Sequence, residues 1–316
     1  MVYLRGTFLD LFVKHFPPTN WAGIKRKEFM KKFVLLISVL VIACCCYAGY
    51  EISRAAGKNL ISITYNGYES EGEETIVITG DAPKKSENRT VAPFHTIVTG
   101  EAIDVVYTAA QNYSMVVEAD RRVIDNVKTE VRGGVLYISY KGRVAIRNSN
   151  QTTIHLTGKD LREVRASSSS DVVLNMAKGA PVPEFKMDIT SAAELVLNHL
   201  SAQRVEIELT STASIVGTIS NAEEVDVDMS SASDLSLSGK CHTLRVDASS
   251  SADADLKNLK AVVANVDASS AATVSVWVSE SLTADASSAA DILYRGEEGV
   301  SVDADTSSAG SVGRLR

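Results

Sequence analysis

The sequence has few of the residues that break strands or cross-link small folds. It contains six prolines in 316 residues, and none follows Pro183. Its four cysteines do not make a disulfide framework, because Cys44, Cys45 and Cys46 are contiguous and Cys241 stands alone, without metal-ligand spacing to a histidine. A disulfide-stapled domain and a zinc module are therefore excluded, and long uninterrupted strands are allowed.

The usual signatures of catalysis are also missing. The chain has no Gly-x-Ser-x-Gly elbow and no phosphate-cradling loop, and its five histidines share no common spacing. The formal net charge is -7 and the sequence pI is near 5.4, with most of the acid in the C-terminal half, which argues against nucleic acid as a partner. With 45% hydrophobic and 22% charged residues, the chain is typical of a folded globular protein.

What the sequence does have is a repeat. The segment Val246–Asp253, VDASSSAD, recurs in recognisable form down to the C-terminus and, more loosely, back to residue 164. The positions equivalent to Asp247 are 18 to 23 residues apart and are Arg165, Asp188, Glu208, Asp228, Asp247, Asp267, Asp285 and Asp305. A period near twenty residues is typical of a stacked-repeat architecture.

Each repeat alternates apolar and polar residues, as in Val225–Met229, which is the period of a half-buried strand. Identical repeats that stack in register place each strand beside its own copy, so the sheets must be parallel. The sequence therefore predicts an all-β fold, a parallel β-helix (β-solenoid) of about eight coils preceded by less regular strands. At about 4.8 Å per coil, the eight coils would be roughly 40 Å long.

Stacking also predicts a ladder of carboxylates along the solenoid. Like charges about 5 Å apart repel by roughly 1 kcal/mol even in water, so water, salt or a bound cation must offset the repulsion. The calcium-binding β-roll nonapeptide is absent, and solvent screening is the favoured explanation. Ca²⁺ is kept as the alternative, with these ladder candidates: Asp228, Asp247, Asp267, Asp285 and Asp305.

Less regular strands are expected before the repeats. Short alternating segments predict strands at 94–98, 103–107, 113–118, 127–131, 135–140 and 152–156, with a helical turn at 121–126. Two further short strands are predicted at 60–65 and 75–79, and Lys84–Arg89 is predicted to be a solvated loop.

The N-terminal segment has the pattern of an export signal. An apolar run at Phe33–Ala43 follows a basic stretch, and Met30 is a second candidate start of translation. Cys44 lies in a lipobox-like context and is the lipidation candidate, whereas Ala48 before Gly49 resembles an ordinary cleavage site; an uncleaved anchor is the third option. We divide the chain into residues 1–50 (basic region with signal peptide, lipobox or anchor), 51–90 (polar extension) and 91–316 (β-helix domain).

Five segments in this order resemble the head GIN domain family, whose members are secreted or lipidated proteins common in Bacteroidetes and labelled auto-transporter adhesins. The segments are Phe94–Ile97, Ile103–Tyr107, Tyr113–Glu118, Val135–Tyr140 and Leu161–Val172. The resemblance covers roughly residues 91–316 and implies fold more than activity. The family's Ser-Gly-Ser or Ser-Gly-Ala corner is Ser-Ser-Ala here, so a corner with positive φ is not expected in this chain.

Three functions are compatible with the sequence. The first is a non-catalytic surface protein of the cell envelope, an adhesin or structural scaffold that displays a repeated Ser/Asp face to a surface ligand, glycan or envelope protein. The second is a carbohydrate-active β-helix enzyme, because stacked carboxylates supply many acid pairs. The third is a membrane-anchored extracytoplasmic sensor or interaction domain. Trp277 is expected to face outward, as a sugar-stacking platform or an ordinary surface residue, and Cys241 is expected to be a buried small hydrophobe.

Overall fold

The structure is a computed structural model that describes residues 76–80, 82–147, 151–177 and 181–315. These residues form strands and one short 3-10 helix, η1 (Ile124–Asn126), which confirms the helical turn predicted at 121–126. None of the helices found among them has the length and apolar character needed to cross a membrane. The predicted strand at 60–65, the apolar run at 33–43, Met30 and Cys44 lie outside the described residues.

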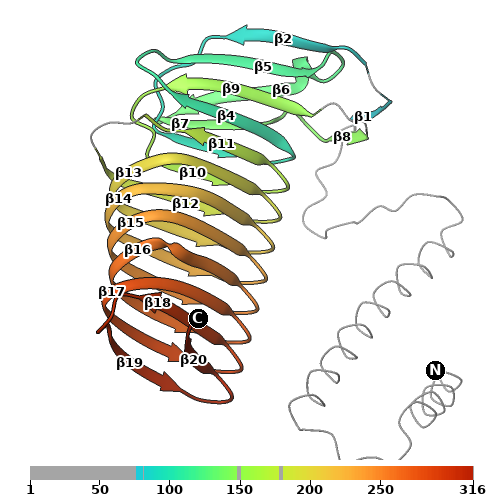
Figure 1. The fold of residues 1–316 in the computed structure, drawn as a ribbon. Helices are drawn as coiled ribbons and strands as arrows, with labels where there is room; N and C mark the ends of the chain where they lie inside the picture. The colour runs from blue at the N-terminus through green and yellow to red at the C-terminus, as the bar shows by residue number, and fades with distance from the viewer. Residues whose placement is uncertain (1–75, 81, 148–150, 178–180, 316) are drawn as a thin grey trace, which may run out of the picture. The chain divides into compact units, whose positions relative to one another are not determined.

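The repeats form a parallel β-solenoid, as predicted, and its coils stack one below another (Figure 1). The eight Ser-rich corners of the repeat enclose about seven turns. The strands of this part are β10 (Glu163–Ala166), β11 (Asp171–Asn175), β12 (Val182–Ile189), β13 (Glu194–Leu209), β14 (Ser214–Met229), β15 (Asp234–Ala248), β16 (Asp253–Ala268), β17 (Thr273–Ala286), β18 (Asp291–Gly296), β19 (Ser301–Thr306) and β20 (Ser311–Arg314).

Each coil consists of two strand segments joined at a tight corner. The segments that lead into the corners pair with one another and form the pre-corner sheet, as in the register Val227 to Val246. The segments that leave the corners form the post-corner sheet, as in Leu235 to Ala254. We call the side with the tight turns the corner edge. The opposite side, where β13 to β17 pass from one sheet to the other without interruption, is the bend edge.

The solenoid interior is filled by stacked small and branched apolar side chains. Every second strand residue points inward, so that Val246 and Ala248 before a corner and Ala254 and Leu256 after it are buried, while Asp247 is exposed and Asp255 half-buried. In a closely packed core of this kind each shortened side chain lowers stability, and a Leu to Ala change lowers the free energy of unfolding by about 2–5 kcal/mol.

Variation in repeat length is absorbed at the bend edge. The register between β16 and β17 shifts between Leu256 and Lys260 and again between Ala261 and Val263, while the residues next to the corners remain aligned. Similar shifts occur between β13, β14, β15 and β16. β-Bulges of this kind change the direction of a strand without ending it. The corner edge is therefore the regular side of the solenoid and the bend edge the irregular one.

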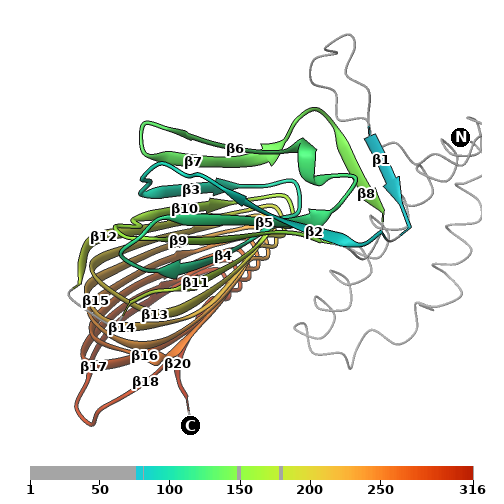
Figure 2. The same ribbon diagram turned by 90° about the horizontal axis from the view of Figure 1, so that it is seen from above.

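The N-terminal part covers the first coils with mixed strands, as predicted. Its strands are β1 (Ile76–Thr79), β2 (Lys84–Arg89), β3 (Thr96–Thr99), β4 (Ile103–Ala109), β5 (Ser114–Asp120), β6 (Val127–Arg132), β7 (Val135–Tyr140), β8 (Val144–Arg147) and β9 (Thr152–Gly158). Strands β3 and β4 form a coil between β10–β11 on one side and β7–β9 on the other. Antiparallel strands β5 and β6 then pair with β9 and β7, and β2 pairs with β5 (Figure 2).

One prediction in this part was wrong. Lys84–Arg89 is strand β2, antiparallel to β5, and not a solvated loop. Its side chains are charged or polar and mostly exposed, so the segment carries no apolar alternation that would indicate a strand. Charged residues of this kind protect a sheet edge from pairing with other chains. The strand predicted at 75–79 is confirmed as β1, which pairs with β8.

Candidate functional site

The corners of the repeat are built by the backbone. Two consecutive residues in each have φ between +47° and +66°, and most corners close with a bond from the fourth residue's N–H to the first residue's C=O, as in a type I′ turn. The first residue with positive φ is serine in all eight repeats, namely Ser168, Ser191, Ser211, Ser231, Ser250, Ser270, Ser288 and Ser308. Hence the expectation that replacing Gly by Ser would exclude positive φ was wrong.

Hydrogen bonds between successive coils hold this unusual backbone in place. The N–H of Ala232 donates to the carbonyl oxygen of Ser250 at 3.0 Å, and the same bond links each repeat corner to the next except at the end of the stack. Positive φ costs a non-glycine residue about 1 kcal/mol or more, and a buried unpaired N–H would cost a similar amount. The ladder therefore offsets the strain. It also leaves the serine side chains exposed rather than committed to closing the turn.

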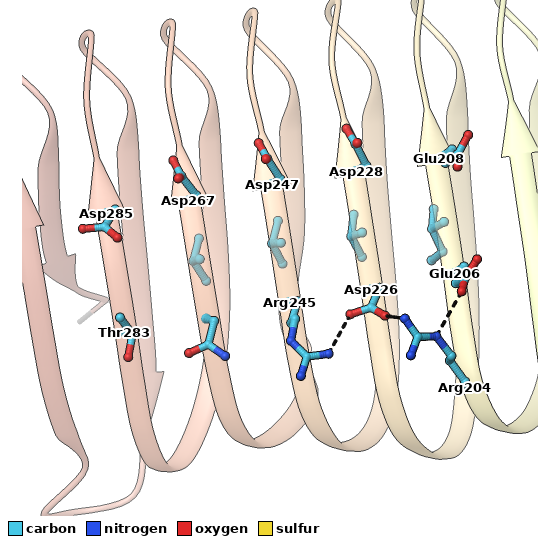
Figure 3. Close-up of a pocket in the computed structure, with 15 residues that line it drawn as sticks. Arg204, Glu206, Glu208, Asp226, Asp228, Arg245, Asp247, Asp267, Thr283 and Asp285 are labelled. Carbon is cyan, nitrogen blue, oxygen red and sulfur yellow. Dashed lines mark hydrogen bonds and ion pairs between the residues drawn. The ribbon is translucent and has the colours of Figure 1, made fainter.

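The predicted acidic ladder is present on the outer surface of the pre-corner sheet. In successive coils Asp228 is in register with Asp247, Asp247 with Asp267, Asp267 with Asp285, and Asp285 with Asp305. All five side chains are exposed, and the four that precede Asp305 line a shallow open groove beside the corners (Figure 3). The column extends in the other direction through Glu208 and Asp188 to Arg165.

The carboxylates of this column lie singly, one per coil. Among the described residues no group of three or more His, Cys, Asp or Glu side chains is arranged to hold a metal ion. Ca²⁺ prefers six to eight oxygen ligands, and a single line of exposed carboxylates presents far fewer to any one point. The geometry thus provides an acidic strip and no preformed calcium cage.

A second acidic column, which the sequence reasoning did not single out, runs along the post-corner sheet. Asp234 is in register with Asp253, and the same column carries Asp104, Asp171, Glu194 and Asp291 in other coils. Burial, followed by repulsion from Asp234 and Asp255, raises the pKa of Asp253. Burial likewise raises the pKa of Asp104, although its carboxylate accepts a hydrogen bond from the Asp171 N–H at 3.1 Å. Ser214 and Thr273 interrupt this second column. The corner serines therefore lie between two columns rich in acid, and Ser191, Ser231, Ser250 and Ser288 have an acidic residue on both sides.

Nearer the bend edge, the pre-corner sheet carries an ion-pair network instead of uncompensated acid. Arg204 contacts Glu206 at 3.0 Å, Glu224 at 2.8 Å and Asp226 at 2.5 Å, and Figure 3 shows it pointing between two carboxylates. Lys186 also pairs with Glu206, and its hydrogen bond is the main cause that lowers the Glu206 pKa. The network neutralises the second row of acids, so the excess negative charge is concentrated beside the corners.

The bend edge carries the other predicted site residue. Trp277 is half-buried and points outward, since its neighbours Val276 and Val278 are fully buried, which confirms the predicted orientation. The Lys260 ammonium lies 5.3 Å from the centroid of the Trp277 ring. Both residues line a surface hollow together with polar, charged and small side chains, among them Asn221, Glu223, Lys240, Cys241, His242, Ser279 and Glu297.

Cys241 is buried beneath this hollow, as expected for a small hydrophobe. Burial raises the pKa of its thiol to about 12. A thiol of that kind is not a nucleophile near neutral pH. The thiol is therefore not a reactive group of the hollow, whose other lining includes Trp277 and charged, amide and hydroxyl side chains.

The architecture defines the class of the protein: an elongated β-solenoid domain with a repetitive serine and carboxylate edge. The chain belongs to the family described as "Putative auto-transporter adhesin, head GIN domain", whose model matches residues 93–297. The resemblance found in the sequence is thereby confirmed. No protein with a curated description matches the chain.

Several solved structures have the same fold. One, described as a putative adhesin from Parabacteroides merdae, matches 76% of this chain and 100% of its own length, with a TM-score of 0.70 and 15% identity. Two from Parabacteroides distasonis, described as a putative adhesin and a putative lipid binding protein, have TM-scores of 0.71 and 0.69. Each shares 17% identity and covers 77% of this chain and 100% of its own. At these identities the likeness shows the fold alone.

Proposed function

We propose that this chain is a non-catalytic protein of the cell envelope that is exported and displays its corner edge on the surface, as an adhesin or a structural binding scaffold. The observation that carries the proposal is the exposed column of eight serines that lies between two columns rich in acidic residues, repeated at about 4.8 Å on a stack of coils. Membership in a family described as adhesins supports it. The expected partners are a surface glycan or an envelope protein.

Repetition favours binding over catalysis. A catalytic site is a single constellation of different groups held in one geometry, whereas this edge offers the same weak contact many times. Several identical contacts on one scaffold multiply the affinity of a ligand that is itself repetitive. The groove beside the corners is lined by charged, amide, hydroxyl and aliphatic side chains and has no aromatic residue to hold a sugar ring.

Fractionation with protease shaving of intact cells tests the proposal. We expect the chain in the envelope fraction, with the corner edge cleaved or labelled from outside before cytoplasmic markers are reached. The mass of the mature N-terminus should show lipid on Cys44, the anchoring expected from the lipobox; cleavage at Ala48 would leave an unlipidated secreted form. Recovery of the chain only from the cytoplasm would overturn the proposal.

A carbohydrate-active enzyme is the second candidate, because neighbouring rungs of the acidic column are separated by about 4.8 Å, near the spacing of about 5 Å used by retaining glycosidases. A polysaccharide panel assayed for new reducing ends decides between the two. We expect no release of reducing ends from any polysaccharide of the panel. Turnover that a single Asp247→Asn or Asp267→Asn change abolishes would establish the enzyme instead. An uncleaved N-terminus embedded in the membrane would favour the third candidate, an anchored extracytoplasmic sensor.

A further inference from the structure

The bend edge carries a row of cations and one aromatic residue on a chain that is acidic as a whole. Lys240 of β15 is in register with Lys260 of β16, Lys260 with Trp277 of β17, and Trp277 with Arg295 of β18. The side chains of Lys240, Lys260 and Arg295 are exposed, and Trp277 is half-buried. Three positive charges in line along the solenoid contrast with the formal net charge of -7.

The groups in this row differ in how far they are already engaged. Arg295 donates to the carbonyl oxygen of Lys257 at 2.6 Å and to Asn258 at 3.0 Å, so it braces the bend. The Lys260 ammonium is held by the face of the Trp277 ring. Contacts of this kind are worth about 0.5–1 kcal/mol at exposed sites, little enough for a ligand to displace. The Lys240 and Lys260 ammonium groups are therefore available to an anion.

The hollow beside the row supplies the rest of a sugar site. Asn221, His242 and Ser279 offer hydrogen-bond donors and acceptors, and the carboxylates of Glu223 and Glu297 can accept bonds from hydroxyl groups. An indole ring binds the apolar face of a sugar ring while polar groups fix its hydroxyls. Coils about 4.8 Å apart place successive groups at roughly the length of one sugar residue.

We propose that the bend edge binds an acidic polysaccharide, with one sugar ring on Trp277 and uronate carboxylates on Lys240 and Lys260. The proposal rests on the surface-binding function above and assigns it a ligand class and a second binding edge. A neutral glycan would make no charged contact with the exposed ammonium groups of Lys240 and Lys260. Nucleic acid is disfavoured, since the chain has a formal net charge of -7 and one aromatic ring can stack few bases.

Calorimetric titration of the purified full-length chain with oligogalacturonate tests the assignment. We expect saturable binding that Trp277→Ala weakens about tenfold and the pair Lys240→Gln with Lys260→Gln by at least as much, because each removes one of the two recognition elements. Trp277→Phe should retain part of the affinity. Lys159→Gln, an exposed lysine of the N-terminal part, is the matched control and should bind like the parent chain. Melting temperatures within a few degrees of the parent chain would show that the variants are folded.

Three results would overturn the inference. Equal binding of the methyl-esterified oligomer would exclude recognition of the carboxylate. Loss of affinity in the lysine pair but not in Trp277→Ala would reduce the row to a nonspecific cationic strip. No titration heat, combined with salt-sensitive self-association that the same variants abolish, would make the bend edge a contact between copies of this chain. If oligogalacturonate does not bind but protease shaving still shows the chain on the cell surface, the proposed function stands and only its ligand class is wrong. If the chain is absent from the envelope, the proposed function is overturned whatever the titration gives.

Discussion

The N–H of Ala232 donates to the carbonyl oxygen of Ser250 at 3.0 Å, from one coil to the next, although both residues have positive φ. The second positive-φ residue of a corner donates to the first positive-φ residue of the following corner, so the ladder continues where the two sheets end. An isolated corner of this sequence would relax, because it would keep the strain and lose the bonds. The conformation is therefore a property of the stack and not of Ser-Ser-Ala itself.

Thr212 is the most strained residue of this ladder, because it combines a β-branched side chain with φ of +60°. We expect Thr212→Gly to raise the free energy of unfolding by about 1 kcal/mol, since glycine adopts this conformation without a steric penalty. Chemical denaturation monitored by circular dichroism measures the change. Ala213→Gly, one residue further on and buried, should destabilise the fold by contrast. Destabilisation by Thr212→Gly would show that its hydroxyl bond to Ser211 outweighs the strain.

Asp253 should make stability depend on pH. Its pKa in the folded chain is raised above the ordinary 3.8, so the folded state holds the proton more tightly than the unfolded state. The contribution of Asp253 to the free energy of unfolding is then most favourable at a pH below its pKa in the unfolded chain. It becomes unfavourable as the pH rises through its pKa in the folded chain. We expect Asp253→Asn to stabilise the protein at pH 7 by roughly 0.5 kcal/mol, a value kept small by solvent screening.

The matched comparison for Asp253 is Asp303→Asn. Asp303 is also an exposed strand residue, but its neighbour in the adjacent coil is Thr283 rather than an acid. Thermal melts of both variants at pH 7 and pH 3, at low and high salt, separate the effects. At pH 7 and low salt, Asp253→Asn should raise the melting temperature by more than Asp303→Asn does. The increase for Asp253→Asn should be smaller at pH 3 and in high salt. A loss of stability at pH 7 would contradict repulsion along the column.

Cys241 should be chemically inert in the folded chain. With the pKa of its thiol raised to about 12, only about one molecule in ten thousand carries the thiolate at pH 8, and the side chain is also buried. We expect iodoacetamide at pH 8 to leave the Cys241 peptide unmodified until denaturant is added, as followed by peptide mass mapping. In a His242→Cys variant the introduced thiol, one residue away and exposed, should react without denaturant. Rapid labelling of Cys241 in the native chain would mean that the bend edge opens.

Repetition explains how much of this structure could be predicted. Equivalent residues such as Asp247 and Asp267 are twenty apart in sequence, so their register followed from the period alone. The backbone of the corners could not be predicted, because bonds from the next coil override the local preference of Ser and Ala. Strand β2 was missed because a charged edge strand buries too little to leave a pattern.

The row at the bend edge was invisible in the sequence for a different reason. Lys260 and Trp277 become neighbours only because the register shifts after Leu256, which breaks the regular period. Trp277 could be singled out alone, as an outward aromatic residue between buried valines. Its cationic neighbours could not be identified from the sequence, because their spacing depends on the bulges of individual coils and not on the repeat.

Calcium should have no specific effect on this protein. The five aspartates from Asp228 to Asp305 lie one per coil and exposed, so any divalent cation reduces their mutual repulsion by screening without finding a cage of oxygen ligands. We expect millimolar Ca²⁺ and Mg²⁺, at equal ionic strength, to raise the melting temperature by the same small amount relative to chelator. Asp247→Asn should not change the difference between the two ions. A rise seen only with Ca²⁺ and lost in Asp247→Asn would show specific binding, because a ligand that binds only the folded state must stabilise it in proportion to its saturation.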